Sequence, residues 1–216
     1  DRWASGRPSC GIGQDQIVRN SLHVPLYSTP GQDDRTVPVL LSRTPLLALL
    51  ATGGQAVIDE TNGLQHAAWN YHEGNARALN WMTAQVRPGF REVRQIDFTA
   101  RDRSSCSACW IAAAEWGSLP GPARFRAVAG RDNQLYLTLD NLSALLIRTR
   151  ESPLDPLQPL RLSVNGGVPI TLSAPLPDSI LLRKIPTGWS AAAAGSDTTA
   201  FALHTPGGVH NLYQRE

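Results

Sequence analysis

Two short stretches, GQDDRTVPV at residues 31–39 and GLQH at residues 63–66, decide the fold of this chain. Each follows an apolar run that is typical of a buried strand, VPLYST at 24–29 and AVIDE at 56–60. The segment between them, LSRTPLLALLATGG at 41–54, is apolar and ends in two glycines, which predicts a helix with its stop signal. The order strand, acidic loop, helix, strand, histidine loop therefore predicts two neighbouring strands of an open parallel sheet.

The two predicted loops carry an aspartate and a histidine, Asp34 and His66. Loops at the carboxyl ends of parallel strands meet at one edge of a sheet, so we expect these side chains to approach although 32 residues separate them. A carboxylate that orients an imidazole is the acid–base half of a nucleophilic triad. Asp33 competes for the role of the acid, and Asp34 also suits a turn or a helix cap. For His66 the alternative is a loop histidine without a partner.

These motifs resemble the C-terminal part of an α/β-hydrolase, in particular the prolyl-oligopeptidase-like branch of peptidases and esterases. That branch shows G-x-x-D-x-x-V-P after one strand and G-x-x-H after the next. The matching residues are Gly31, Asp34, Val37, Pro38, Gly63 and His66. The resemblance implies that Asp34 is the acid and His66 the general base of a serine hydrolase that cleaves ester or peptide bonds. It also implies a secreted or periplasmic location.

One departure from the family pattern concerns the nucleophile. In this fold the serine sits in a G-x-S-x-G turn upstream of the acid, and the sequence contains no such motif. The Gly188-Trp189-Ser190 stretch lies after the histidine and breaks the required order. We therefore expect this chain to be a fragment or subunit of a larger enzyme that is inactive alone. Its partner would be the missing N-terminal hydrolase part or a complementary chain that carries the serine.

The composition carries no strong electrostatic signature. The 216 residues are 42% hydrophobic and 18% charged with a net charge of +2, and Lys184 is the single lysine. Arginines alternate along apparent strands at 124–126 and 148–150, which indicates solvent faces rather than a nucleic-acid surface. No apolar run reaches the length of a membrane span, so we expect neither nucleic acid nor membrane as a partner.

The character of the sequence changes after Arg87-Pro88-Gly89. Short β-prone runs then follow one another closely and are separated by turn signals, which is typical of an antiparallel β-sandwich. The predicted fold class is α/β plus all-β, with a partial α/β-hydrolase in residues 1–88 and an antiparallel β-sandwich accessory domain in residues 89–216. AAAAGSDTT at 191–199 predicts a flexible loop, and FALHT at 201–205 a weak strand.

The second part also resembles the β-domain that follows the hydrolase in some bacterial prolyl-oligopeptidase-like esterases. There a strand, a Leu-Asp-x-x-x-Pro turn and a V-N-G turn recur. The residues that fit are Asp155, Pro159, Val164, Asn165 and Gly166. We expect Trp110, Trp116 and Phe125 to anchor the core of this part.

The three cysteines are Cys10, Cys106 and Cys109. Cys106 and Cys109 have the spacing of a redox pair, but they lead into an apparent strand rather than a helix. Two residues three apart on an extended strand point to opposite faces, so we expect no disulfide between them. The remaining histidines offer no matching metal ligands. We expect isolated small cysteines that are buried or half-buried, no metal and no cofactor.

Two other functions stay open at the level of the sequence. The chain could be a non-catalytic β-sandwich module that binds carbohydrate or protein, with residues 1–90 as a scaffold. It could also be an intact subunit that completes its triad with a partner chain.

Overall fold

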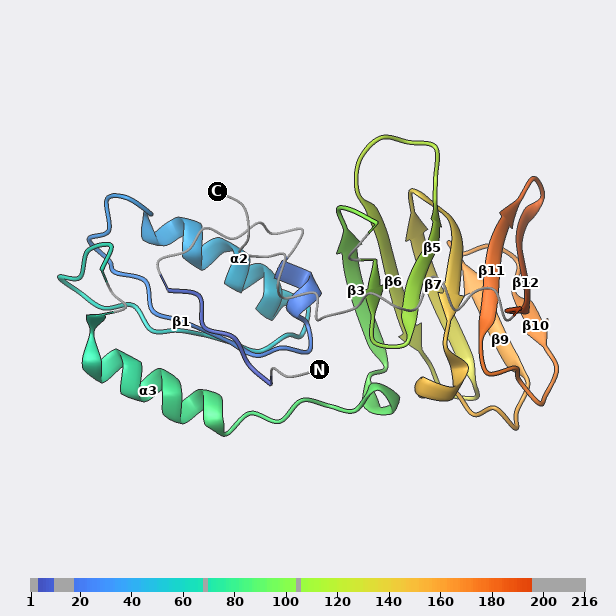
Figure 1. Ribbon diagram of the computed structural model, residues 1–216, viewed down its shortest axis with the longest axis horizontal. Helices are drawn as coiled ribbons and strands as arrows, with labels where there is room; N and C mark the ends of the chain where they lie inside the picture. Colours follow the sequence, from blue (N-terminus) through green and yellow to red (C-terminus); the bar gives the residue numbers. More distant parts are fainter. Residues whose placement is uncertain (1–3, 10–17, 68–69, 104–105, 196–216) are drawn as a thin grey trace. The chain divides into compact units, whose positions relative to one another are not determined.

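The computed structural model of the chain describes residues 4–9, 18–67, 70–103 and 106–195. The chain divides into two compact units, and the division falls between Pro88 and Gly89. It is mostly sheet with few helices (Figure 1). The first unit contains two short parallel strands with their helices, and the second contains two five-stranded sheets that are largely antiparallel.

The first unit is built around two parallel strands with one helix on each side. Leu26 pairs with Ala56 and Ser28 with Ile58, and Gly6 forms a further parallel bridge to Leu26. Figure 1 shows the two helices on opposite sides of these strands, and one packs on each strand. The elements are η1 (Arg19–Ser21), β1 (Leu26–Ser28), α2 (Val39–Ala51), β2 (Ala56–Ile58) and α3 (His72–Thr83).

Helix α2 lies where the sequence predicts it, although it begins two residues earlier. It ends because Gly53 adopts a left-handed conformation with φ of 88°, which closes the helix without steric cost to a Cβ. The helix is apolar on almost its whole circumference. Leu46 and Leu49 are buried, whereas Leu40 and Leu47 are 60% and 51% exposed.

In its described residues, the second unit contains ten strands and two short 3₁₀ helices. One sheet has the order β10-β9-β7-β6-β3 and the other β12-β11-β8-β5-β4. The helices are η3 (Phe90–Glu92) and η4 (Thr149–Glu151). The strands are β3 (Gln95–Ala100), β4 (Ser107–Ala108), β5 (Ile111–Trp116), β6 (Ala123–Ala129), β7 (Gln134–Asp140), β8 (Leu142–Ile147), β9 (Leu160–Val164), β10 (Ile170–Leu172), β11 (Ile180–Ile185) and β12 (Gly188–Ala193).

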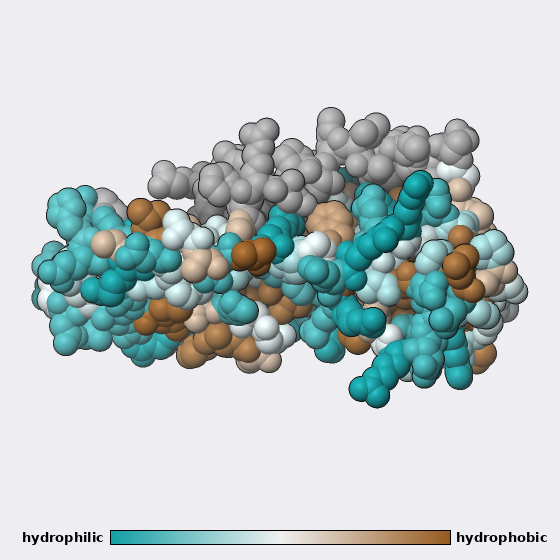
Figure 2. All heavy atoms as spheres, turned by 90° about the horizontal axis from the view of Figure 1, so that it is seen from below, coloured by the Kyte–Doolittle hydropathy of each residue, from teal (hydrophilic) through white to brown (hydrophobic). Residues whose placement is uncertain are grey.

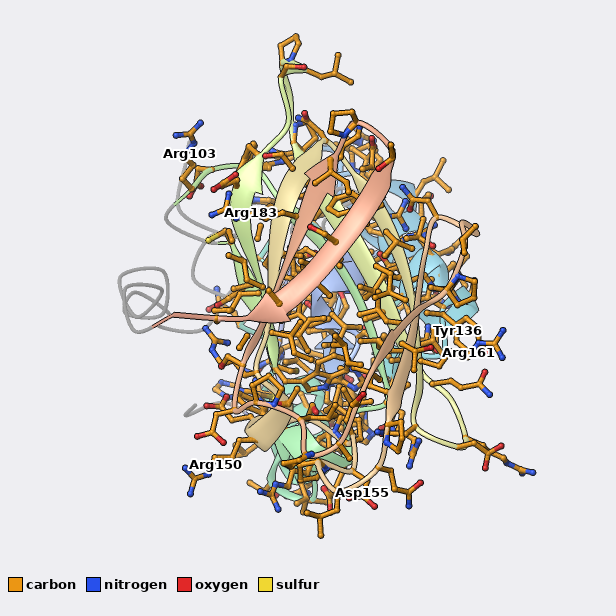
Figure 3. The ribbon with its side chains drawn as sticks, turned by 90° about the vertical axis from the view of Figure 1, so that its right-hand side faces the viewer. Arg103, Tyr136, Arg150, Asp155, Arg161 and Arg183 are labelled. Carbon is orange, nitrogen blue, oxygen red and sulfur yellow. The ribbon has the colours of Figure 1, made fainter. Side chains whose placement is uncertain are left out.

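One hydrophobic cluster is shared by both sheets of the second unit. In β7 the leucines at 135, 137 and 139 are buried and the side chains between them are exposed or half-buried, as alternation along a strand requires. Trp110 and Phe125 are fully buried in the cluster, whereas Trp116 packs against it half-buried. Figure 3 shows that exposed side chains of this unit, such as Arg183 and Tyr136, lie on different sides of it.

Two details of the second unit correct the sequence analysis. The pairing is not purely antiparallel, because β7 and β9 run parallel with Leu135 opposite Leu162. The start of the predicted loop at 191–199 is a strand, because β12 forms a hairpin with β11. The turn lies at Pro186 and Thr187, and Gly188, whose φ is 137°, begins β12. The predicted strand at 201–205 lies outside the described residues.

The cysteines that the structure describes form no disulfide. Cys106 and Cys109 are half-buried thiols on either side of β4. Burial raises the pKa of the Cys106 thiol, so this thiol is protonated at neutral pH and a weak nucleophile. Cys10 lies outside the described residues.

The surface is mixed in character. Figure 2 shows hydrophilic side chains over much of one face, with apolar side chains in small groups among them. Within the described ranges, none of the helices combines the length and the apolar character that crossing a membrane requires.

Candidate active site

The acidic loop and the histidine loop are joined by backbone hydrogen bonds beyond the ends of β1 and β2. Gln32 N–H donates to Thr61 O at 3.1 Å, and Asp33 N–H donates to Leu64 O at 3.0 Å. A parallel bridge between Gly31 and Thr61 continues the pairing of the strands into the loops. The loops are therefore paired with each other as the strands are, and their side chains are held in a defined register.

The geometry of the loops explains why two positions of the motifs, 31 and 63, are occupied by glycine. A Cβ on Gly31 would collide with the backbone carbonyl oxygens of Leu64 and Gln65 in the histidine loop. Gly63 has a φ of 74°, a conformation that side-chain-bearing residues rarely adopt. The first glycine permits the close approach of the two loops, and the second permits the turn that leads to His66.

The structure brings Asp34 and His66 into contact. Asp34 Oδ2 and His66 Nδ1 are 2.9 Å apart. The other oxygen, Oδ1, accepts hydrogen bonds from the backbone N–H groups of Thr36 and Val37, both at 2.8 Å. The Asp34 side chain is 1% exposed and that of His66 is 39% exposed. The carboxylate is thus held by hydrogen bonds and shielded from solvent, and the imidazole is partly exposed.

The electrostatics of the pair follow from this geometry. Burial by itself would raise the pKa of Asp34, but the hydrogen bonds from Val37, His66 and Thr36 together outweigh burial and hold the pKa below its ordinary value of 3.8. Asp34 is therefore ionised at neutral pH and can only accept hydrogen bonds. Nδ1 of the neutral imidazole must then carry the hydrogen, which leaves Nε2 with an electron pair that can take a proton.

Asp33, the alternative acid, lies elsewhere. It is exposed, and its backbone rather than its side chain takes part in the pairing of the loops. Ser5 and Ser9, two serines that precede β1, form hydrogen bonds with groups other than His66. Ser5 Oγ donates to Met82 O at 3.3 Å, and Ser9 Oγ lies 3.2 Å from Thr29 Oγ1.

Four residues that the sequence analysis did not single out form two ion pairs at the start of the histidine loop. Asp59 and Glu60 directly follow β2, and each is bonded to an arginine of a different helix, Arg77 and Arg43 respectively. The sequence feature that could have pointed to these ion pairs is the pair of adjacent acidic residues at the end of a predicted strand. In the parts of the chain that are described, no three His, Cys, Asp or Glu side chains gather closely enough to bind a metal ion.

The chain was compared with known proteins. No protein-family model matches it, and no curated protein does. Among solved structures, it is similar to the crystal structure of a thermostable esterase, with 28% sequence identity and a TM-score of 0.36. The match covers 39% of this chain and 24% of that chain, so the matched part spans about a quarter of the length of the esterase. The chain thus has a partial structural similarity to an esterase.

Replacing Gly31 by alanine tests the close approach of the loops. The new methyl group would force the carbonyl groups of Leu64 and Gln65 away, and such overpacking costs about 1–3 kcal/mol. We expect amide hydrogen exchange at Gln32 and Asp33 to accelerate by roughly 10- to 100-fold, since 1.4 kcal/mol corresponds to a factor of ten. Gly89→Ala is the control, because its Cβ would meet only the Glu92 side chain at an ordinary distance. Equal exchange rates in the two variants would contradict the assignment.

The lowered pKa of Asp34 predicts a pH-dependent contribution to stability. A carboxyl whose pKa is lower in the folded than in the unfolded chain stabilises the fold above its unfolded pKa, and this contribution is lost as the pH falls through the folded-state pKa. We expect Asp34→Asn to be less stable than the wild type at pH 7, and the gap in unfolding free energy to narrow as the pH falls below 3.8. Urea unfolding at several pH values measures this gap. Asp33→Asn, which removes an exposed carboxylate from the same loop, is the control. A gap for Asp34→Asn that stays constant down to acid pH would refute the prediction.

Proposed function

We propose that Asp34 and His66 are the acid and the general base of a serine hydrolase that cleaves ester or peptide bonds. The observation that carries this proposal is the 2.9 Å contact between Nδ1 of His66 and the buried carboxylate of Asp34. The contact orients the imidazole, sets its tautomer and leaves Nε2 as the atom that can accept a proton. These are the properties that a triad requires of its acid and base.

The chemistry follows from this arrangement. His66 Nε2 would take the proton of a serine hydroxyl as the serine oxygen attacks the substrate carbonyl carbon. The imidazolium so formed would be stabilised by Asp34, whose negative charge is fixed and shielded from water. The imidazolium would then return the proton to the leaving group, which departs as an alcohol or an amine. Water would release the acyl group in a second round with the same proton transfers.

The nucleophile belongs, in this proposal, to a polypeptide outside the given sequence. Support comes from the sequence, which contains no G-x-S-x-G motif, and from the order acid then histidine, which in α/β-hydrolases follows the nucleophile. The polypeptide could precede this chain or be a separate subunit. Residues 1–88 would then be the C-terminal portion of an α/β-hydrolase domain, and residues 89–216 a β-sandwich accessory domain.

The parallel strands of the first unit support the assignment of residues 1–88 to a hydrolase domain. β1 and β2 are parallel, each ends in one of the two loops, and a helix packs on each of them. In the second unit, two five-stranded sheets share one buried cluster, which suits an accessory domain with its own core.

Activity-based labelling tests the assigned roles. This chain is produced together with the polypeptide encoded directly before it, and the labelling rate with a fluorophosphonate probe is measured. We expect His66→Ala and Asp34→Asn to lower the rate by about 10⁴-fold, the loss typical of a broken triad. His72→Ala is the matched control, because His72 is exposed at the start of α3 and should label as the wild type does. Labelling that is unaffected by both His66→Ala and Asp34→Asn would sink the proposal.

A second candidate function is the binding of a carbohydrate by the second unit. A cavity of about 440 Å³ is lined by Arg103, Glu115, Trp116 and Ser143 among others, a volume within the range of small-ligand sites. A bulge in β5 between Ala113 and Trp116 displaces its side chains at this point. The half-buried indole offers an apolar face, and the charged and hydroxyl groups beside it suit the hydroxyl groups of a pyranose ring.

Tryptophan fluorescence tests this second function. The chain is titrated with a panel of neutral hexasaccharides, and we expect binding to at least one of them to be lost in Trp116→Ala. Tyr136→Ala is the control, because Tyr136 is a 50% exposed aromatic residue that Figure 3 shows on the other side of the unit from Arg103. Binding that is absent from the whole panel, or equally strong in Trp116→Ala, would rule this function out.

A further inference from the structure

The histidine loop begins with two adjacent acids that are held by arginines from different helices. Arg77 of α3 contacts Asp59 with Nε at 3.0 Å and with Nη2 at 2.8 and 3.1 Å. Arg43 of α2 contacts Glu60 with Nε at 2.8 Å and Nη2 at 2.7 Å. Because successive residues of an extended chain point in opposite directions, the two carboxylates reach the two helices that flank the strands. The start of the loop is therefore tied on both sides.

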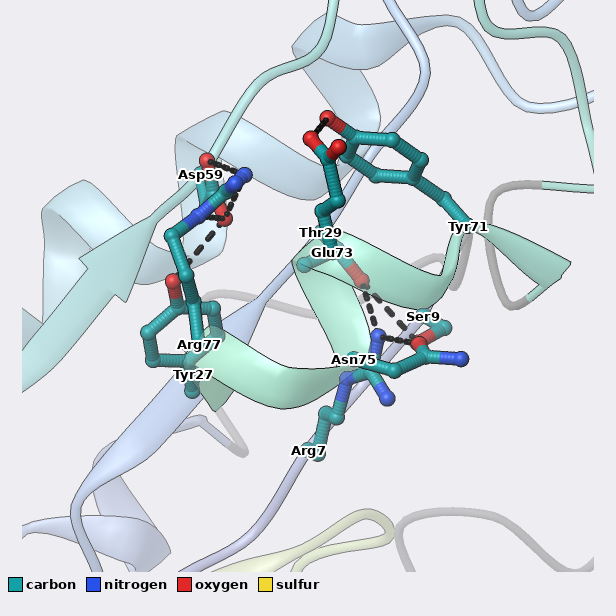
Figure 4. Close-up of polar contacts among 9 residues, drawn as sticks. All are labelled: Arg7, Ser9, Tyr27, Thr29, Asp59, Tyr71, Glu73, Asn75 and Arg77. Atoms are coloured by element: carbon teal, nitrogen blue, oxygen red, sulfur yellow. Dashed lines mark hydrogen bonds and ion pairs between the residues drawn. The ribbon is translucent and has the colours of Figure 1, made fainter. Parts of the chain in front are cut away.

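Each pair has additional support. Tyr27 of β1, a buried residue, donates its hydroxyl hydrogen to Asp59 Oδ2 at 2.9 Å. The guanidinium of Arg77 lies 5.7 Å from the centre of the Tyr71 ring, within the range of a cation–π contact. Figure 4 shows Asp59 joined by hydrogen bonds to both the Arg77 guanidinium and the Tyr27 hydroxyl. These contacts join both strands and α3 at one point.

The second pair also reaches the acidic loop. Gln32, two residues before Asp34, approaches Glu60 Oε2 with its Nε2 at 3.4 Å. The hydrogen bond from Arg43 lowers the pKa of Glu60, although its partial burial acts in the opposite direction. Glu60 is thus ionised at neutral pH, where it can hold Arg43 and Gln32 together. The contact connects α2 with both loops of the candidate site.

The exposed fractions of the paired side chains indicate whether the ion pairs contribute to stability or to the geometry of the loop. The carboxylate side chains are 19% and 18% exposed and the arginines 49% and 40% exposed. Exposed ion pairs add little to overall stability, but bidentate pairs restrict geometry strongly. Between these pairs and His66 the loop contains exposed residues and Gly63, whose φ of 74° turns the chain toward His66. A fixed starting point narrows the positions that His66 can reach.

We infer that Arg43 and Arg77 are positioning residues for His66, which place its imidazole against Asp34 through Glu60 and Asp59. This inference rests on the proposed function for its catalytic meaning, but the placement itself is a property of this chain. Both arginines bind the carboxylates at the start of the histidine loop, so both act on the imidazole through the loop.

Imidazole NMR tests the inference without any hydrolytic assay. In the ¹⁵N-histidine-labelled chain, the hydrogen bond from Nδ1–H to Asp34 gives a far-downfield proton signal and the ¹⁵N shifts of the Nδ1–H tautomer. We expect Arg43→Gln and Arg77→Gln each to lose this signal and to shift His66 toward a mixture of tautomers. Arg131→Gln is the control, because it removes one exposed positive charge from the second unit and should leave the signal unchanged. A signal that persists in both arginine variants would overturn the inference.

Two further measurements separate placement from folding and from the proposed function. Thermal unfolding should be close to that of the wild type in both variants, because the arginines are 40% and 49% exposed. Arg43→Gln, Glu60→Gln and the double variant form a cycle in which all three should lose the downfield signal. A signal that is lost in Arg43→Gln but kept in Glu60→Gln would show that Arg43 does not act through this carboxylate. A wild-type chain without the downfield signal would instead refute the Asp34–His66 pair, and with it the proposed function.

Discussion

The close approach of two backbone loops at Gly31 is the constraint on which the candidate site depends. The acidic loop passes the carbonyl groups of Leu64 and Gln65 so closely that no Cβ can stand between them. Only at this separation can the N–H groups of Gln32 and Asp33 donate to the histidine loop. The pairing then fixes the register of the two loops, and with it the positions of the two candidate side chains, Asp34 and His66. A local requirement for glycine thus determines a contact between residues that are distant in sequence.

Much of this arrangement can be predicted from the sequence because it rests on local signals. The strands at 26–28 and 56–58 lie inside the apolar runs, and α2 lies between them, ended by glycine. Parallel strands bring their carboxyl ends to one edge, so the meeting of Asp34 and His66 follows from topology. The G-x-x-D spacing of the motif favours Asp34 over Asp33. The structure gives a physical reason for this spacing, because Asp34 Oδ1 accepts hydrogen bonds from the backbone N–H groups of Thr36 and Val37.

The features that the sequence analysis missed or misread depend on partners far away in the chain. The alanine-rich segment of β12 has little strand character of its own and is extended because it pairs with β11. Hydrophobic alternation shows which face of a strand is buried but not which strand lies beside it, so it does not predict the parallel pairing of β7 and β9. The arginine pairs of Asp59 and Glu60 likewise need the positions of both helices, which the pattern of apolar residues sets only approximately.

The unequal exposure of the two site residues links the fold to the chemistry. A buried, ionised carboxylate is costly unless several donors satisfy it, and Asp34 has two backbone donors besides the imidazole. Its negative charge is stabilised by these backbone donors as well as by the imidazole. In the proposed mechanism the carboxylate therefore stays in place while His66 receives a proton. In the proposed mechanism this base needs a loop that is held as firmly as the acid, and we propose that role for Arg43 and Arg77 of the two flanking helices.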